Sequence, residues 1–143
     1  MRVVEQNGVG ALDRVDRTRV TVAVGPLVGP VLSRIVGIHA ARAELPFDRL
    51  NDAVLVADAI AARAPAFTVA ARLPVSIQSG PGRLELRIGP LRPGGGRSVI
   101  EGAALPRVGS VIERLADDVQ VREGAGGDEY LVLRIDASAP ERT

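Results

Sequence analysis

The apolar positions of the chain follow two different periods, which predicts a protein built from both helices and strands. Residues 19–24 alternate between valine and other residues, a spacing typical of a strand. Over 27–43 and again over about 47–64, apolar residues recur every three or four positions, as on the buried side of a helix. Because only three residues join these two helices, we expect them to pack as antiparallel neighbours.

After Pro65 the pattern becomes alternating, which indicates strands joined by glycine-containing turns. The predicted strands span 69–78, 84–88, 119–122 and 129–135, and they form two hairpins. Residues 90–96 contain two prolines and three glycines, so they predict a loop without regular structure. A third helix is expected over 108–116, between the two hairpins.

This order of elements predicts a two-layer α/β sandwich of the α+β class. Each helix has a single apolar side to bury, so all helices should pack on one face of a mixed, mostly antiparallel sheet. One domain is expected over 19–136. A flexible segment, 1–18, would precede it, and a disordered tail, 137–143, would follow it.

Composition excludes several classes of function. The 143 residues include 18 arginines, no lysine, 17 carboxylates, one histidine and no cysteine. Cysteine zinc sites, thiolate nucleophiles and Schiff-base chemistry are therefore excluded, and no metal site is expected. A net charge of +1 disfavours nucleic acid as a partner. The absence of a long apolar run disfavours a membrane, and an N-terminus without a signal peptide predicts a cytoplasmic protein.

Two stretches of the chain carry a resemblance to a known family. They are 50–64 and 108–121, the second containing Leu115-Ala116-Asp117 followed by a Val-x-Val strand, with Gly126-Gly127 and 130–133 beyond it. The chain resembles the bacterial anti-sigma factor serine kinases. These belong to the histidine kinase, gyrase, heat-shock chaperone and MutL ATPase superfamily. The similarity covers about residues 19–136, nearly all of the predicted domain.

The resemblance implies an ATP site with degenerate motifs. The family's second helix carries an acidic residue and, four positions later, an asparagine that holds Mg²⁺; the corresponding pair here is Asp58 and Ala62. An aspartate could still orient or deprotonate a hydroxyl, but alanine has no atom that can coordinate a cation. The family's adenine-binding aspartate and glycine after the central hairpin are replaced by a segment containing Gly89.

Glycines that could approach an anion persist in the implied site. Gly94, Gly95 and Gly96 lie in the predicted loop, and Gly109 lies at the start of the third helix. Their backbone N–H groups could face a phosphate. With Asp58, Ala62 and Gly89 they make up a vestigial nucleotide site. The segment does not fit the Walker A pattern, because arginine stands where that pattern has lysine.

Simpler interpretations of the same residues carry weight. Asp58 can be a solvated residue on the polar side of a helix, and His39 can be a structural histidine, because it has no evident Asp or Ser partner nearby in sequence. Asp117 and Asp118 are expected to face water rather than to bind a metal.

The leading hypothesis is an anti-sigma-like regulator that works by partner switching. By resemblance, its partners are a sigma factor, an anti-anti-sigma domain, or both. No cofactor is expected, although ATP and Mg²⁺ would bind if the site were functional. Candidate partner-binding residues are Arg34, His39 and Arg42 on the first helix, and Arg92 and Arg97 around the glycine-rich loop. One alternative is an active ATP-dependent serine/threonine kinase with Asp58 as its base. Another is a structural homodimer with a vestigial pocket.

Overall fold

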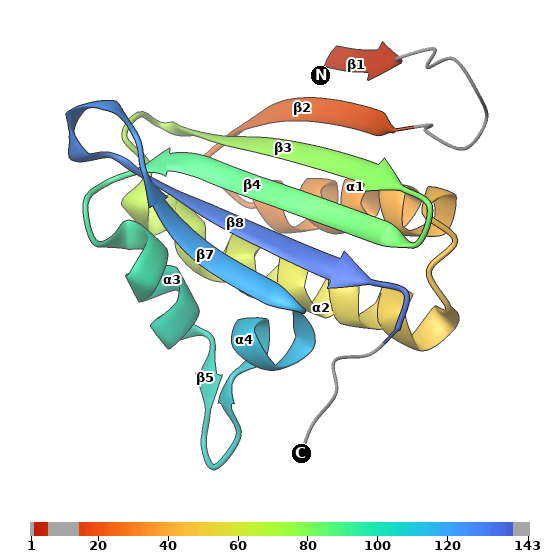
Figure 1. The fold of residues 1–143 in the computed structure, drawn as a ribbon. Helices are drawn as coiled ribbons and strands as arrows, with labels where there is room; N and C mark the ends of the chain where they lie inside the picture. Colours follow the sequence, from red (N-terminus) through yellow and green to blue (C-terminus); the bar gives the residue numbers. More distant parts are fainter. Residues whose placement is uncertain (1, 6–14, 139–143) are drawn as a thin grey trace.

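The main sheet has six strands, and the larger helices lie along one side of it (Figure 1). The structure is a computed structural model that describes residues 2–5 and 15–138. In chain order the elements are β1 (Arg2–Glu5), β2 (Asp16–Ala23), α1 (Val28–Arg42), α2 (Phe47–Arg63), the 3₁₀ turn η2 (Ala64–Phe67), β3 (Arg72–Gly80), β4 (Arg83–Leu91), α3 (Gly95–Gly102), β5 (Ala104–Leu105), β6 (Gly109–Ser110), α4 (Val111–Leu115), β7 (Asp118–Glu123), the 3₁₀ turn η3 (Ala125–Gly127) and β8 (Glu129–Asp136).

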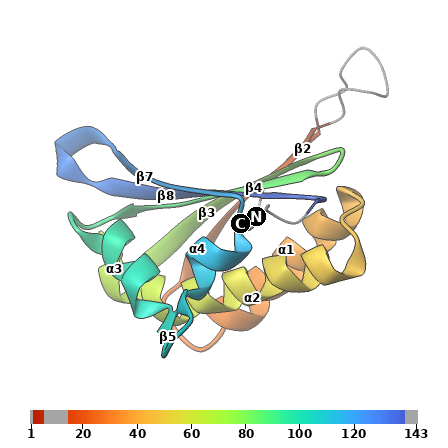
Figure 2. The ribbon, with the colours of Figure 1, turned by 60° about the horizontal axis from the view of Figure 1, so that its bottom comes forward.

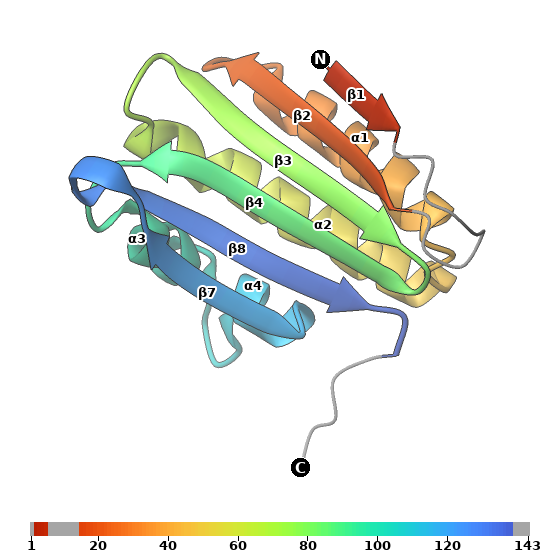
Figure 3. The ribbon, with the colours of Figure 1, turned by 45° about the horizontal axis from the view of Figure 1, so that its top comes forward.

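The strands of the main sheet are ordered β1-β2-β3-β4-β8-β7, and each described pairing is antiparallel (Figure 3). The hairpins β3–β4 and β7–β8 are those that the alternating pattern predicts. The second hairpin inserts with β8 beside β4, so β7 lies at the edge. Strands β5 and β6 pair only with each other.

The helices cover one face of the sheet, which confirms the predicted two-layer sandwich (Figure 2). Helices α1 and α2 pack side by side against it, and they bury apolar residues at helical spacing. The facing side of the sheet contributes inward residues of β3, β4 and β8, such as Ile77, Leu86 and Leu133, to the same core. None of the helices in the described residues has both the length and the apolar character needed to cross a membrane.

A buried arginine connects the helix layer to the sheet. Arg49 of α2 has only 2 % of its side chain exposed and uses all three guanidinium nitrogens as donors. Nη2 donates to Asp117 Oδ2 at 2.7 Å and Nη1 to Asp52 Oδ2 at 2.8 Å. Nη1 also donates to the Leu115 carbonyl, and Nε to the Asp136 carbonyl. The prediction that Asp117 faces water is therefore wrong, since this carboxylate neutralises a buried cation.

The glycine-rich segment is more ordered than its composition predicts. Strand β4 continues to Leu91, and α3 begins at Gly95, so the prediction of a loop over 90–96 is wrong. A Cβ at Gly95 would lie 2.9 Å from the Phe67 Cβ atom, and one at Gly96 would lie 2.8 Å from a Val121 methyl group. These glycines allow α3 to pack closely on the layers beneath it, and that tertiary contact outweighs their low helix propensity.

The helix expected over 108–116 is shorter than predicted. Only Val111–Leu115 is helical, because 109–110 pair with 104–105 as a small hairpin. Strand β1 and the start of β2 lie in the segment 1–18, where no regular element was expected. Residues 6–14 of that segment and 139–143 of the predicted tail lie outside the described residues. At 137, a backbone N–H donates to the Gly82 carbonyl.

Candidate functional site

The acidic residue of the implied nucleotide site has a partner on the neighbouring helix. Asp58 lies on the exposed side of α2, and its Oδ1 accepts a hydrogen bond from the hydroxyl of Ser33 on α1. Ala62, one turn further along α2, is also exposed. The carboxylate of Asp58 is therefore engaged at the outer junction of the two helices.

The N-terminus of α3 is occupied by a carboxylate of the chain itself. Gly94 has a φ of 81°, a left-handed conformation that suits glycine, and it directly precedes the helix. The Gly96 N–H donates to Glu129 Oε1 at 3.0 Å. A phosphate at this helix start would need the same N–H group, so Glu129 takes the place that an anionic ligand would need.

The two remaining glycines of the implied site have different surroundings. Gly89 is buried in β4 with a φ of 141°, and an added Cβ would lie 2.7 Å from the Glu129 carbonyl oxygen. Gly109 has a φ of 83° in β6 and faces open space. Arg92 and Arg97, the candidate partner residues near α3, are both exposed. Gly89 is thus a packing residue, and the two arginines are available to solvent.

The candidate residues on the first helix lie along one groove. It is bounded by α1 and by the helix-facing side of β2, and its volume is about 410 Å³. We call it the α1 groove; its lining residues are Thr18, Val31, Arg34, Ile35, Ile38, His39 and Arg42. The structure therefore brings Arg34, His39 and Arg42 together at one groove.

The walls of the α1 groove are apolar and its rim is cationic. Arg34, Ile38 and Arg42 follow one another at four-residue intervals, so they share one side of α1. Ile38 has 47 % of its surface exposed, a large value for an isoleucine next to other apolar residues. Arg42 approaches Asp16 of β2 at 3.7 Å, whereas the Arg34 guanidinium has no ion pair or hydrogen bond within residues 15–138.

His39 forms the buried base of the α1 groove. Its Nε2 lies 2.7 Å from the Thr18 hydroxyl and its Nδ1 lies 2.8 Å from the Ser79 hydroxyl. Burial lowers the pKa of His39, Arg42 lowers it further, and Asp16 acts in the opposite direction. A neutral ring with one N–H and one bare nitrogen suits two hydroxyl partners, of which one donates and the other accepts.

These contacts favour the structural interpretation of His39. The ring ties α1 to β2 and β3, and both of its nitrogens are engaged. Sequence reasoning missed Thr18 and Ser79 as its partners, because they lie 21 and 40 residues away from it. Alternation within the strands does place both hydroxyls on the helix-facing side of the sheet, which is the one signal that could have suggested them.

Metal ligands and known relatives are two sources of information about the described residues. No group of three or more His, Asp or Glu side chains within them is placed to hold a metal ion. Neither the scan against models of protein families nor the search of curated proteins finds a match to this chain. Inference about function therefore rests on the geometry of the chain's own residues.

Proposed function

We propose that this protein is a regulatory domain that binds a protein partner through the α1 groove. The observation that carries the proposal is an exposed apolar strip on α1, including Ile38, between the guanidinium groups of Arg34 and Arg42. An apolar strip with a charged rim is the surface that an amphipathic helix of a partner recognises. Its apolar residues would enter the groove, and its acidic residues would meet the two arginines.

The resemblance to anti-sigma factor kinases suggests the identity of the partner. In that family, a sigma factor is sequestered and is then released by an anti-anti-sigma domain. We extend this scheme to the present chain, as a cytoplasmic regulator of transcription that acts by partner switching. Release would then depend on competition between two proteins for one surface, through their difference in affinity.

Two internal contacts support the view that ATP binding is lost or weakened. Glu129 accepts the Gly96 N–H at the start of α3, and Ser33 engages the Asp58 carboxylate on α2. A triphosphate at the α3 N-terminus would have to displace Glu129 and would meet its negative charge. Ala62 supplies no oxygen atom for Mg²⁺. Neither ATP nor Mg²⁺ is therefore part of the proposed mechanism.

Calorimetry with the purified sigma factor and anti-anti-sigma domain of the native host tests the proposal. We expect Ile38→Asp to weaken partner binding at least about tenfold, because the carboxylate would have to be desolvated in an apolar contact. The matched control is Leu105→Asp. Leu105 is 52 % exposed in β5, similar to the 47 % of Ile38, and it lies outside the groove. Absence of binding to both partners, or equal effects of the two variants, would overturn the proposal.

Titration with MgATP separates this function from the kinase alternative. We expect no heat signal at millimolar nucleotide, and we expect Asp58→Ala to retain the partner affinity of the wild type. A micromolar dissociation constant that requires Mg²⁺, together with phosphotransfer that Asp58→Ala abolishes, would establish the serine kinase instead.

A further inference from the structure

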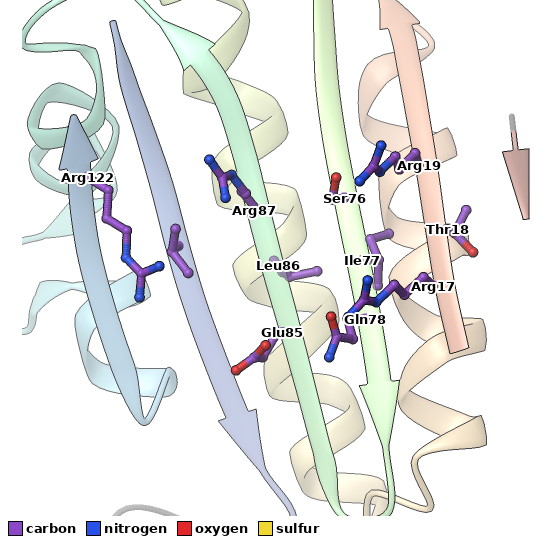
Figure 4. Close-up of a pocket in the computed structure, with 11 residues that line it drawn as sticks. Arg17, Thr18, Arg19, Ser76, Ile77, Gln78, Glu85, Leu86, Arg87 and Arg122 are labelled. Atoms are coloured by element: carbon purple, nitrogen blue, oxygen red, sulfur yellow. The ribbon is translucent and has the colours of Figure 1, made fainter. Parts of the chain in front are cut away.

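The face of the main sheet opposite the helices carries a second groove. Its volume is about 260 Å³, and side chains of β2, β3, β4, β7 and β8 line it (Figure 4). We call it the sheet groove. Its charged residues are Arg17 and Arg19 of β2, Glu85 and Arg87 of β4, and Arg122 of β7. Four guanidinium groups therefore face one carboxylate.

Within residues 15–138, no carboxylate forms an ion pair with any of these four arginines. The guanidinium groups of Arg17 and Arg19 extend toward β3 in Figure 4 and have no ion pair or hydrogen bond within residues 15–138. Arg122 donates to the side chain of Gln120, which is uncharged, and Arg87 lies over the Tyr130 ring at 4.2 Å from its centroid. The groove consequently keeps a net positive charge.

The arginines are arranged across the strands. Arg19 is paired with Ser76, Ser76 with Arg87, and Arg87 with Val132, so these side chains form one row over β2, β3, β4 and β8. Arg122 lies beyond that row on β7. With neighbouring strands about 4.8 Å apart, the positive charges extend over roughly 20 Å. A single small anion cannot reach all of them, whereas about six residues of an extended peptide can.

The side chains of the sheet groove favour an acidic peptide over single-stranded nucleic acid or a second copy of the chain. Sites for single-stranded nucleic acid typically combine a positively charged groove with exposed aromatic rings on which the bases stack. The chain has one tyrosine, two phenylalanines and no tryptophan, and the Tyr130 ring is covered by Arg87. A second copy of the chain would oppose arginine to arginine if the two sheet grooves met face to face. Carboxylates on an extended segment need no stacking and complement the charge.

We propose that the sheet groove docks an extended acidic segment of a partner protein. The carboxylates of that segment pair with Arg17, Arg19, Arg87 and Arg122, and its backbone crosses the strands. The helices lie on one side of the sheet (Figure 2). The α1 groove is on that side and the sheet groove is on the other, so the chain can hold two protein segments at once. Binding here does not depend on the function proposed for α1.

Fluorescence anisotropy tests this proposal with a labelled peptide of about eight residues in which glutamate and serine alternate. We expect binding at low salt that weakens as ionic strength rises, because the contacts are between exposed charges. Arg19→Glu should lower the affinity at least about tenfold, since it replaces attraction by repulsion at the β2 end of the row, next to Arg17. The peptide with glutamine in place of glutamate should not bind.

Arg107→Glu is the matched control, because it changes the net charge equally at an exposed residue outside the sheet groove. It should leave the affinity within about twofold of the wild type. Equal losses in the two variants would mean that net charge alone attracts the peptide, and the proposal would fail. It would also fail if the acidic peptide did not bind, or if oligothymidylate of similar length bound more tightly. The Ile38→Asp variant should bind the peptide with the affinity of the wild type. Failure of this proposal can therefore be distinguished from failure of the function proposed for the α1 groove.

Discussion

Two parts of the helix layer differ in how many of their polar groups bond to other parts of the chain. One part, called the α2 side here, consists of α2 and the start of α3, and the other is the α1 groove. On the α2 side, the Arg49 guanidinium, the Asp58 carboxylate and the Gly96 N–H all bond to other parts of the chain. At the α1 groove, the Arg34 guanidinium is unpaired within the described residues, and Ile38 is half exposed. The first region is satisfied internally, whereas the second has unused capacity for contacts.

This difference bears on where a ligand could bind. The family resemblance implies nucleotide chemistry around α2 and the start of α3, yet two of the polar groups that this chemistry would use, the Asp58 carboxylate and the Gly96 N–H, are already engaged. A ligand there would have to break an existing bond before making its own, which reduces its net gain. A partner's carboxylate at Arg34 would break no existing bond, because the Arg34 guanidinium has no ion pair or hydrogen bond within residues 15–138. Physical availability therefore favours protein contact on α1 over nucleotide contact on α2.

The largest expected effect compares two arginines, one from each region. Arg49→Met should lower the free energy of unfolding by about 3–5 kcal/mol, because Asp52 and Asp117 would lose the cation that neutralises them. Arg34→Met should change it by less than about 0.5 kcal/mol. Urea denaturation followed by circular dichroism measures both. A similar loss of stability in the two variants would mean that the bonds of Arg49 contribute no more to the fold than the exposed Arg34 does.

The next prediction compares two glycines, and we expect effects of opposite sign. Gly95→Ala should destabilise the fold by about 1–3 kcal/mol, since its Cβ would lie 2.9 Å from that of Phe67 and 3.1 Å from that of Leu91. Gly37→Ala should stabilise it by about 0.5–1 kcal/mol. Gly37 lies inside α1, where a Cβ would have its nearest neighbour at 3.9 Å.

Thermal unfolding of the two glycine variants gives the sign directly. A rise in melting temperature for Gly95→Ala would show that α3 can move away from η2 at little cost. The tight packing that we attribute to the α2 side would then be absent. A fall in melting temperature for Gly37→Ala would show that α1 lacks the space for a methyl group that the structure indicates.

Periodicity in the sequence predicts those helices and strands in which the spacing of apolar residues shows which side is buried. The helices expected over 27–43 and 47–64 are found at Val28–Arg42 and Phe47–Arg63, and both hairpins are present. Helix α3 could not be predicted in this way. Its glycines resemble a loop locally, and only their contacts with Phe67, Leu91 and Val121, which come from other elements, explain the helix.

The same division applies to the candidate site. Arg34 and Arg42 could be grouped from the sequence because a helix of regular pitch places them on one side. The partners of His39 on β2 and β3, and of Arg49 beside β8, depend on how strands distant in the sequence are brought beneath the helices. The family resemblance stays a prediction. It pointed to Asp58 and Gly96, but their hydrogen-bond partners, Ser33 and Glu129, could be found only from the structure.

The smallest expected effect is a dependence of stability on pH that comes from the base of the α1 groove. The pKa of His39 is lowered from its ordinary value of 6.5, chiefly by burial, so the unfolded chain binds a proton more readily than the fold does. Above about pH 6.5 the ring is neutral in both states, and its contribution is complete. As the pH falls below that value, the free energy of unfolding should decrease, until the folded ring is protonated too.

Denaturation of the wild type and of His39→Gln between about pH 5 and 8 measures this contribution as a difference in slope. Arg42→Met should reduce the slope without removing it, because Arg42 is the second cause of the lowered pKa and burial is the first. Asp16, which raises the pKa, should have the opposite effect when changed to asparagine. If Arg42→Met instead leaves the slope unchanged, the rim of the α1 groove is electrostatically separate from its base. A partner's carboxylate at Arg42 would then have no influence on His39.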